Sequence, residues 1–107
     1  MRKTTVEAAL AVTLALASGA AAAQDAKALQ LRALAATCAN CHGSDGRPPP
    51  GSVLPALAGI PAARFNERMQ VFKSGAAGPT VMHQIAKGFN DAQIEQMAAY
   101  FAAQKPL

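Results

Sequence analysis

The sequence predicts an all-α fold in which three main helices are joined by loops. In three stretches, apolar residues recur every three or four positions, which is the spacing of one face of an α-helix. Breaks rich in glycine and proline, which cannot continue a helix, separate these stretches. No stretch shows the pattern of a strand. A chain of 107 residues is expected to form one domain with a limited core.

The beginning of the chain has the pattern of an export leader. Arg2 and Lys3 give a basic start, residues 6–20 are mainly apolar, and the small residues 21–23 offer a cleavage site. A retained membrane anchor is the alternative, but the apolar core is short for a span of about 20 residues. We expect residues 1–23 to be a signal peptide. No cysteine near the cut could carry a lipid, so a soluble periplasmic domain without membrane insertion is expected over residues 24–107.

The first helix of this domain is expected to run from Asp25 to about Cys41. Asp25 is a good helix cap, and Leu29, Leu31 and Leu34 supply an apolar face. The next stretch, from Gly43 to Gly59, is rich in glycine, proline and serine. It is predicted to be a long loop, and loops of this length within compact domains generally have a function.

A second helix is expected between Pro61, which suits a first turn, and Gly75, which ends the run. Phe65, Met69 and Phe72 fall on one face of this helix. After another break of glycine and proline, residues 84–87 are expected to form a short helical turn.

The final helix is predicted to start after Asn90, because Gln93 stands three residues further on and completes a capping box. Its apolar residues fall on a common face: Ile94, Met97, Ala98 and Phe101. The product is an all-α chain with loops available to surround a bound group.

Two thiols three positions apart, followed at once by an imidazole, are the strongest chemical signal in the chain. Cys38, Cys41 and His42 form the attachment signature of a c-type haem. Each thiol would add to one haem vinyl group, and one helical turn brings the adjacent imidazole to the iron. We therefore expect one covalent haem c with His42 as its proximal ligand. The second ring nitrogen then needs a hydrogen-bond acceptor to fix the ring.

Other chemistry remains open for the same residues. A disulfide between Cys38 and Cys41 suits an exported chain, a redox dithiol uses the same spacing, and a zinc site could begin with this pair. The disulfide gives His42 no role, and the dithiol requires a βαβ pattern that the sequence lacks. Zinc requires four ligands, and His83 is the only other candidate.

Charge gives little information about function. The formal net charge of +4 at pH 7 falls after removal of the leader, and two haem propionates would bring the domain close to neutrality. No basic run is interleaved with aromatic residues, so a nucleic-acid partner is not expected.

Several segments across the whole predicted domain together resemble class I c-type cytochromes with one haem. The nearest pattern is similar to the cytochrome subunit of flavocytochrome c sulfide dehydrogenases. The segments are 38–43 with 45–46, 55–59, 72–75, 80–82 with 85–88, and 98–101. This resemblance implies a cytochrome c-like all-α fold wrapped around one covalently attached haem.

The resemblance also implies roles for particular residues. Met82 matches the distal methionine, whose thioether would bind the iron opposite His42. Pro55 matches the proline whose carbonyl accepts the second N–H of the proximal histidine. Tyr100 or Phe101 matches the aromatic position through which the last helix packs on the first.

Distal ligation can also be considered from the residues themselves. Met69 and Met97 lie on apolar helix faces and are expected to fill the core, whereas Met82 is expected in a loop that could present it to iron. His83 is the competing ligand, and an open or bis-histidine site is the alternative.

The resemblance leaves the residues that anchor the haem propionates open. Family members often keep a tryptophan near the propionates, and this sequence has none. Arg47 is the candidate for that role.

The expected function is single-electron transfer rather than catalysis, because an iron with both axial positions filled has no place for a substrate. The chain would be a soluble carrier or the electron-accepting subunit of an oxidoreductase with a flavoprotein partner. Redox partner proteins would dock at the haem edge, near Lys73, Lys87 and Arg47. The alternatives are a haem enzyme or gas-binding protein with an open site, and a haem-free disulfide module.

Overall fold

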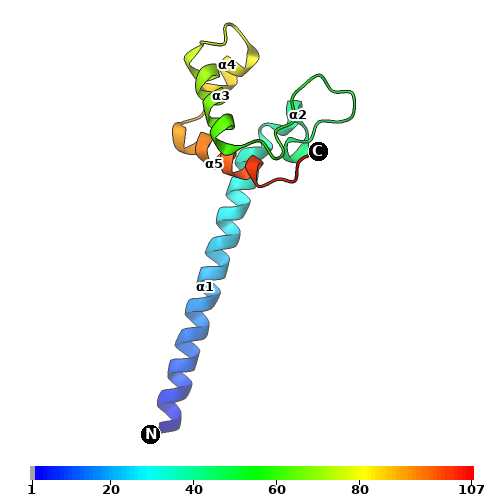
Figure 1. Cartoon of the computed structure of the whole chain (residues 1–107). Coiled ribbons are helices and arrows are strands. Elements are labelled where there is room, and N and C mark those ends of the chain that lie inside the picture. The colour runs from blue at the N-terminus through cyan, green and yellow to red at the C-terminus, as the bar shows by residue number, and fades with distance from the viewer. Residues whose placement is uncertain (1) are drawn as a thin grey trace. The chain divides into compact units, whose positions relative to one another are not determined.

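In the computed structural model, every regular element of the described chain is helical, which confirms the predicted all-α class (Figure 1). The structure describes residues 2–107, and the side chains of all of these except positions 13–18 and 21. The elements are α1 (Arg2–Ala36), α2 (Ala39–His42), the 3₁₀ turn η1 (Ser44–Gly46), α3 (Ala62–Ser74), α4 (Val81–Ala86) and α5 (Asp91–Ala102).

The chain divides into two units, one ending at Gln30 and the other running from Leu31 to Leu107. The first consists of the N-terminal part of α1, and all of its described side chains are exposed. Met1 and the side chains of Thr13 and Ser18, which belong to the predicted leader, lie outside the described part. Cleavage of that leader stays a prediction. Of the helices described, none combines the length and the apolar character needed to cross a bilayer.

The prediction that a helix starts at Asp25 is wrong, because α1 is continuous through this position. Alanine dominates the sequence around Asp25, and alanine has the highest intrinsic helix propensity, so nothing there interrupts the helix. Asp25 therefore lies within α1 instead of capping it.

The end of α1 also differs from the prediction, because the helix stops at Ala36 rather than continuing to Cys41. The hydroxyl of Thr37 donates to the Leu34 carbonyl at 2.7 Å, and such a bond competes with the regular helical ladder. The backbone N–H of Cys38 bonds to the carbonyl three residues earlier, at 3.1 Å. Because of this tighter turn, the two cysteines and His42 lie on the separate short helix α2 and the residue before it.

The core of the second unit forms where α3 packs against α4 and α5. The rings of Phe65 and Phe101 lie 5.5 Å apart between centroids, and Ala35 from the end of α1 joins the same cluster. The four apolar residues predicted on one face of α5 are all buried. The buried cluster consists of Ala35, Phe65, Met69, Ala86, Ile94, Met97, Ala98 and Phe101.

The boundaries of α3 and α5 follow the sequence signals. Gly75 ends α3 at φ +81°, a left-handed conformation that glycine adopts without a side-chain penalty. The predicted capping box is present, with the Gln93 N–H donating to Asn90 Oδ1 at 2.8 Å and the Asn90 N–H to Gln93 Oε1 at 2.9 Å. Asp91 links the two helices, because it accepts from Lys73 Nζ at 3.1 Å.

The predicted long loop is fastened by backbone hydrogen bonds rather than by regular elements. The Gly46 carbonyl accepts from the N–H groups of Leu57 and Ala58 at 2.8 and 3.1 Å, and the Gly59 N–H donates to the Phe101 carbonyl at 2.8 Å. A Cβ at Gly46 would lie 2.7 Å from the Ala58 nitrogen, so this close approach requires glycine. These bonds hold the loop segment that contains Pro55.

Candidate functional site

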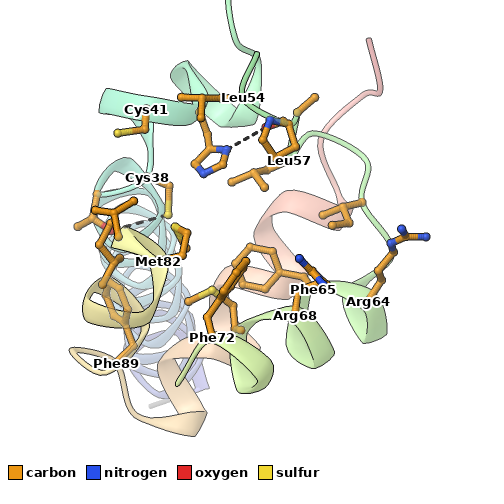
Figure 2. Close-up of a pocket in the computed structure, with 18 residues that line it drawn as sticks. Cys38, Cys41, Leu54, Leu57, Arg64, Phe65, Arg68, Phe72, Met82 and Phe89 are labelled. Atoms are coloured by element: carbon orange, nitrogen blue, oxygen red, sulfur yellow. Dashed lines mark hydrogen bonds between the residues drawn. The ribbon is translucent and has the colours of Figure 1, made fainter. Parts of the chain in front are cut away.

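The second unit contains a cavity of about 650 Å³ with a mainly apolar lining. Its walls come from the cysteine segment, the loop at 54–60, one face of α3, and α4 with Phe89. Figure 2 shows Cys38, Cys41 and Met82 toward one side of the cavity and Phe65, Arg68 and Arg64 toward the other. This volume lies within the range of roughly 300–1,000 Å³ that is usual for cofactor pockets.

The structure brings the predicted attachment residues to this cavity. Cys38, Cys41 and His42 all line it, and both cysteines are free thiols. The Nδ1 atom of His42 lies 2.8 Å from the Pro55 carbonyl oxygen (Figure 2). A carbonyl can only accept, so Nδ1 carries the proton and donates, which leaves Nε2 with a free lone pair for a metal.

The Cys38 thiol is partly buried. Burial raises its pKa, and a hydrogen bond with Thr37 offsets this in part. The Cys38 Sγ and Thr37 Oγ1 atoms lie 3.9 Å apart. The attacking thiol of a redox dithiol depends on a lowered pKa, so the raised pKa of Cys38 gives no support to the dithiol alternative.

The two candidates for the distal ligand occupy different places. Met82 is half-buried and lines the cavity, whereas His83 is not among the lining residues. The Nδ1 atom of His83 lies 2.6 Å from the Phe72 carbonyl, and its ring rests against Gly75. Contacts with α3 and the turn that follows it therefore hold the imidazole of His83.

The prediction that Met82 lies in a loop is wrong. Met82 belongs to the first turn of α4, which begins at Val81, three residues before the expected helical turn. Thr80 caps this helix, because its side chain accepts from the His83 N–H at 3.3 Å. A capped turn presents the Met82 side chain from a more ordered position than a loop would.

The other two methionines of the domain also have distinct places. Met97 is fully buried in the core and does not line the cavity, whereas Met69 is buried in the core and also contributes to the cavity wall. Met69 is therefore the one other thioether that could be compared with Met82 by experiment.

Arg64 and Arg68 of α3, the two arginines in the cavity lining, were not predicted from the sequence. Arg47, which was expected near the propionates, does not line the cavity, and its guanidinium donates to the carbonyl of Lys105. The signal was present in the spacing, since Arg64, Arg68 and Phe72 stand four residues apart and so share a helix face.

The two lysines expected at the haem rim are not part of the cavity lining itself. Lys73 forms an ion pair with Asp91. The largest single cause that lowers the pKa of Asp91 is a hydrogen bond from Gln70, and Lys73 lowers it as well. Neither Lys73 nor Lys87 lines the cavity. Its lining instead includes exposed apolar side chains, with Val81 71%, Leu54 41% and Ile85 39% exposed.

The residues present fit a haem. Two thiols, an imidazole with one available nitrogen and a thioether converge on an apolar cavity that has two arginines among its lining residues. In the part of the chain that the structure describes, no three His, Cys, Asp or Glu side chains gather as ligands for a bare metal ion. A porphyrin already supplies four nitrogen ligands to its iron, so the protein needs to provide only the axial ones.

Most of this chain is similar in sequence to a known protein family and to several named proteins. Residues 23–101 match the sequence profile of a family described as "Cytochrome C oxidase, cbb3-type, subunit III". A cytochrome c4 of Pseudomonas aeruginosa is 38% identical over 96 residues, covering 90% of this chain and 46% of that protein. A thiosulfate dehydrogenase electron acceptor of Thiomonas intermedia is 36% identical over 72 residues, covering 67% of this chain and 33% of that protein.

The cytochrome subunit of sulfide dehydrogenase from Chlorobaculum tepidum is also similar, with 37% identity over 68 residues, 64% of this chain and 60% of that protein. The chain therefore spans between a third and three fifths of the length of these relatives.

Proposed function

This chain belongs to the cytochrome c family, in which haem c is covalently bound, and from that premise we propose that it transfers single electrons through one haem held in the cavity by Cys38, Cys41, His42 and Met82. The observation that carries this proposal is the His42–Pro55 hydrogen bond at the edge of a cavity that Met82 also lines. When bound, the haem would supply an iron that alternates between the ferric and ferrous states.

Each residue has a separate task in this proposal. Cys38 and Cys41 would form thioether bonds, and His42 would bind the iron through Nε2 while Pro55 keeps the ring in the required tautomer. Met82 would supply the second iron ligand from the chain. With both axial positions occupied by the chain, a substrate has no vacant site, which favours electron transfer over catalysis.

Short elements hold these ligands in place. The backbone N–H of His42 donates to the Cys38 carbonyl at 2.9 Å, and the Thr80 cap orders the turn that carries Met82. If a haem is bound here, ligands held in this way would need little rearrangement between its two oxidation states.

The names of two relatives support the kind of partner that we propose for this chain. One is named as an electron acceptor of thiosulfate dehydrogenase and another as the cytochrome subunit of sulfide dehydrogenase. We place this chain in the same role, as a carrier or electron-accepting subunit in the periplasm, with a redox protein such as a flavoprotein as its donor. The exposed apolar side chains of Leu54, Val81 and Ile85 suit a small, transient interface near the haem edge.

The experiment is to express the full chain with a cytochrome maturation system and to extract the purified protein with acidic acetone. The wild type and an Asn40→Ala control should retain the pigment, whereas a Cys38→Ala/Cys41→Ala variant should lose it. The reduced wild type should not bind carbon monoxide readily, because Met82 fills the distal position. Ready binding of carbon monoxide would contradict this ligation, and a colourless wild type would overturn the proposed function.

A further inference from the structure

The cavity lining carries an uncompensated positive charge. Arg64 and Arg68 line the cavity, and no aspartate or glutamate does so. Within residues 2–107, neither arginine has a carboxylate at ion-pair distance. Glu67, which stands between them in the sequence, is exposed and does not contribute to the lining. The lining of the cavity therefore includes two cationic residues and no anionic one.

The two arginines are positioned by α3. They are four residues apart, so they lie on the same helix face about 6 Å apart along the axis. The guanidinium carbon of Arg68 stands 5.0 Å from the centroid of the Phe72 ring (Figure 2), a cation–π contact that restricts its position. Two like charges at this spacing repel each other. An anion bound beside them would reduce this electrostatic repulsion.

A haem matches this arrangement in charge. Its two propionates lie on one edge of the porphyrin and carry two negative charges, and a guanidinium can donate two parallel hydrogen bonds to a carboxylate. The apolar lining suits the porphyrin faces, while the exposed side chains of Arg64 and Arg68 suit an edge that reaches solvent.

We propose that Arg64 and Arg68 bind the two haem propionates, an inference that rests on the proposed occupation of this cavity by haem. Arg47, the other candidate, is held by the Lys105 carbonyl and does not line the cavity. The arginine pair would therefore anchor the propionates in place of the tryptophan that family members often have there and that this sequence lacks.

The proposal has a defined electrostatic consequence. A positive charge near the iron disfavours the more positive ferric state and so raises the reduction potential. Paired propionates also stay ionised to lower pH, because an adjacent cation favours the charged form. Removal of the guanidinium groups should lower the potential at neutral pH. It should also move the pH-dependent fall in potential, which accompanies propionate ionisation, to higher pH.

The test compares holoproteins carrying Arg64→Gln, Arg68→Gln and both changes, with Arg47→Gln as the matched control. Reduction potential is measured by redox titration across a pH series, and the absorption spectrum checks that haem and its axial ligands are retained. We expect both single variants to lower the potential, the double variant to lower it further, and Arg47→Gln to leave it near the wild-type value. Arg68→Lys should restore part of the loss, because lysine keeps the charge but not the paired hydrogen bonds.

Two results would overturn the inference. One is a double variant with a native spectrum whose potential and pH profile equal those of the wild type, and the other is a shift confined to Arg47→Gln. If the double variant does not fold, the single variants and Arg68→Lys carry the same test. A wild-type chain that takes up no covalent haem would instead overturn the proposed function, so the two failures are distinguishable.

Discussion

The Pro55 carbonyl decides which nitrogen of His42 is free. It accepts a hydrogen bond from Nδ1 at 2.8 Å, so the ring presents Nε2 as a base. The carbonyl is in place because Gly46 accepts two hydrogen bonds from the returning loop at Leu57 and Ala58. A glycine that does not itself line the cavity thereby contributes to the orientation of a proposed iron ligand.

Tyr100 carries a second residue-scale interaction, because its hydroxyl donates to the carboxylate of Asp45. This hydrogen bond raises the pKa of Tyr100, with burial and the charge of Asp45 acting in the same direction and Arg32 opposing them. Asp45 has a φ of +54°, which is uncommon for a residue with a side chain. The contact therefore fastens a strained turn next to α2 onto α5.

The Tyr100–Asp45 contact predicts a pH dependence of stability. A pKa raised in the folded state gives a contribution that is fully present below the unfolded value of about 10 and is lost as the pH rises through the folded value. Tyr100→Phe should cost about 1 kcal/mol at neutral pH and should flatten the loss of stability above pH ~10. Urea unfolding of the two holoproteins over a pH series measures this, and parallel curves with no offset would show that the contact contributes nothing.

At the scale of elements, α5 depends on its N-terminal cap. Asn90 and Gln93 satisfy each other's backbone N–H groups, and the helix then buries Ile94, Met97 and Phe101 against α3. The cap therefore stabilises the element that supplies much of the core beneath the cavity.

Replacement of Asn90 by alanine should lower the free energy of unfolding by about 1 kcal/mol, the usual cost of losing such a cap. Gln96→Ala, at an exposed position of the same helix, is the control and should change it by no more than about 0.5 kcal/mol. Chemical denaturation of the holoprotein gives both values. Equal effects of the two substitutions would mean that the capping box is not a determinant of stability.

At the scale of the whole molecule, the sequence predicted those elements whose limits are encoded locally. The limits of α3 and α5 follow from Gly75 and from the Asn90 box, and their apolar spacing identified the core. The C-terminal end of α1 and the start of α4 were not predicted, because they depend on the hydroxyl of Thr37 and on the Thr80 cap. Threonine also occurs within ordinary helices and loops, so its presence alone does not mark a helix limit.

The candidate site was predictable to a similar extent. The residues that a short motif or a resemblance marks, Cys38, Cys41, His42 and Met82, do line one cavity. The charged residues of that cavity were missed because arginines on a helix face usually lie in solvent, and only tertiary packing shows which face closes a cavity. Arg47, although close to the motif in sequence, is bound to the carbonyl of Lys105 instead.

The most direct test of the account is the reduction potential and oxidised absorption spectrum of Met82→Ala, measured beside Met69→Leu. Met69 is the other methionine in the cavity wall, and leucine keeps most of its volume. If Met82 binds the iron, its removal should abolish the weak methionine-to-iron band and lower the potential, since a methionine ligand raises it, while Met69→Leu should leave both unchanged. An unchanged band and potential in Met82→Ala would contradict the account.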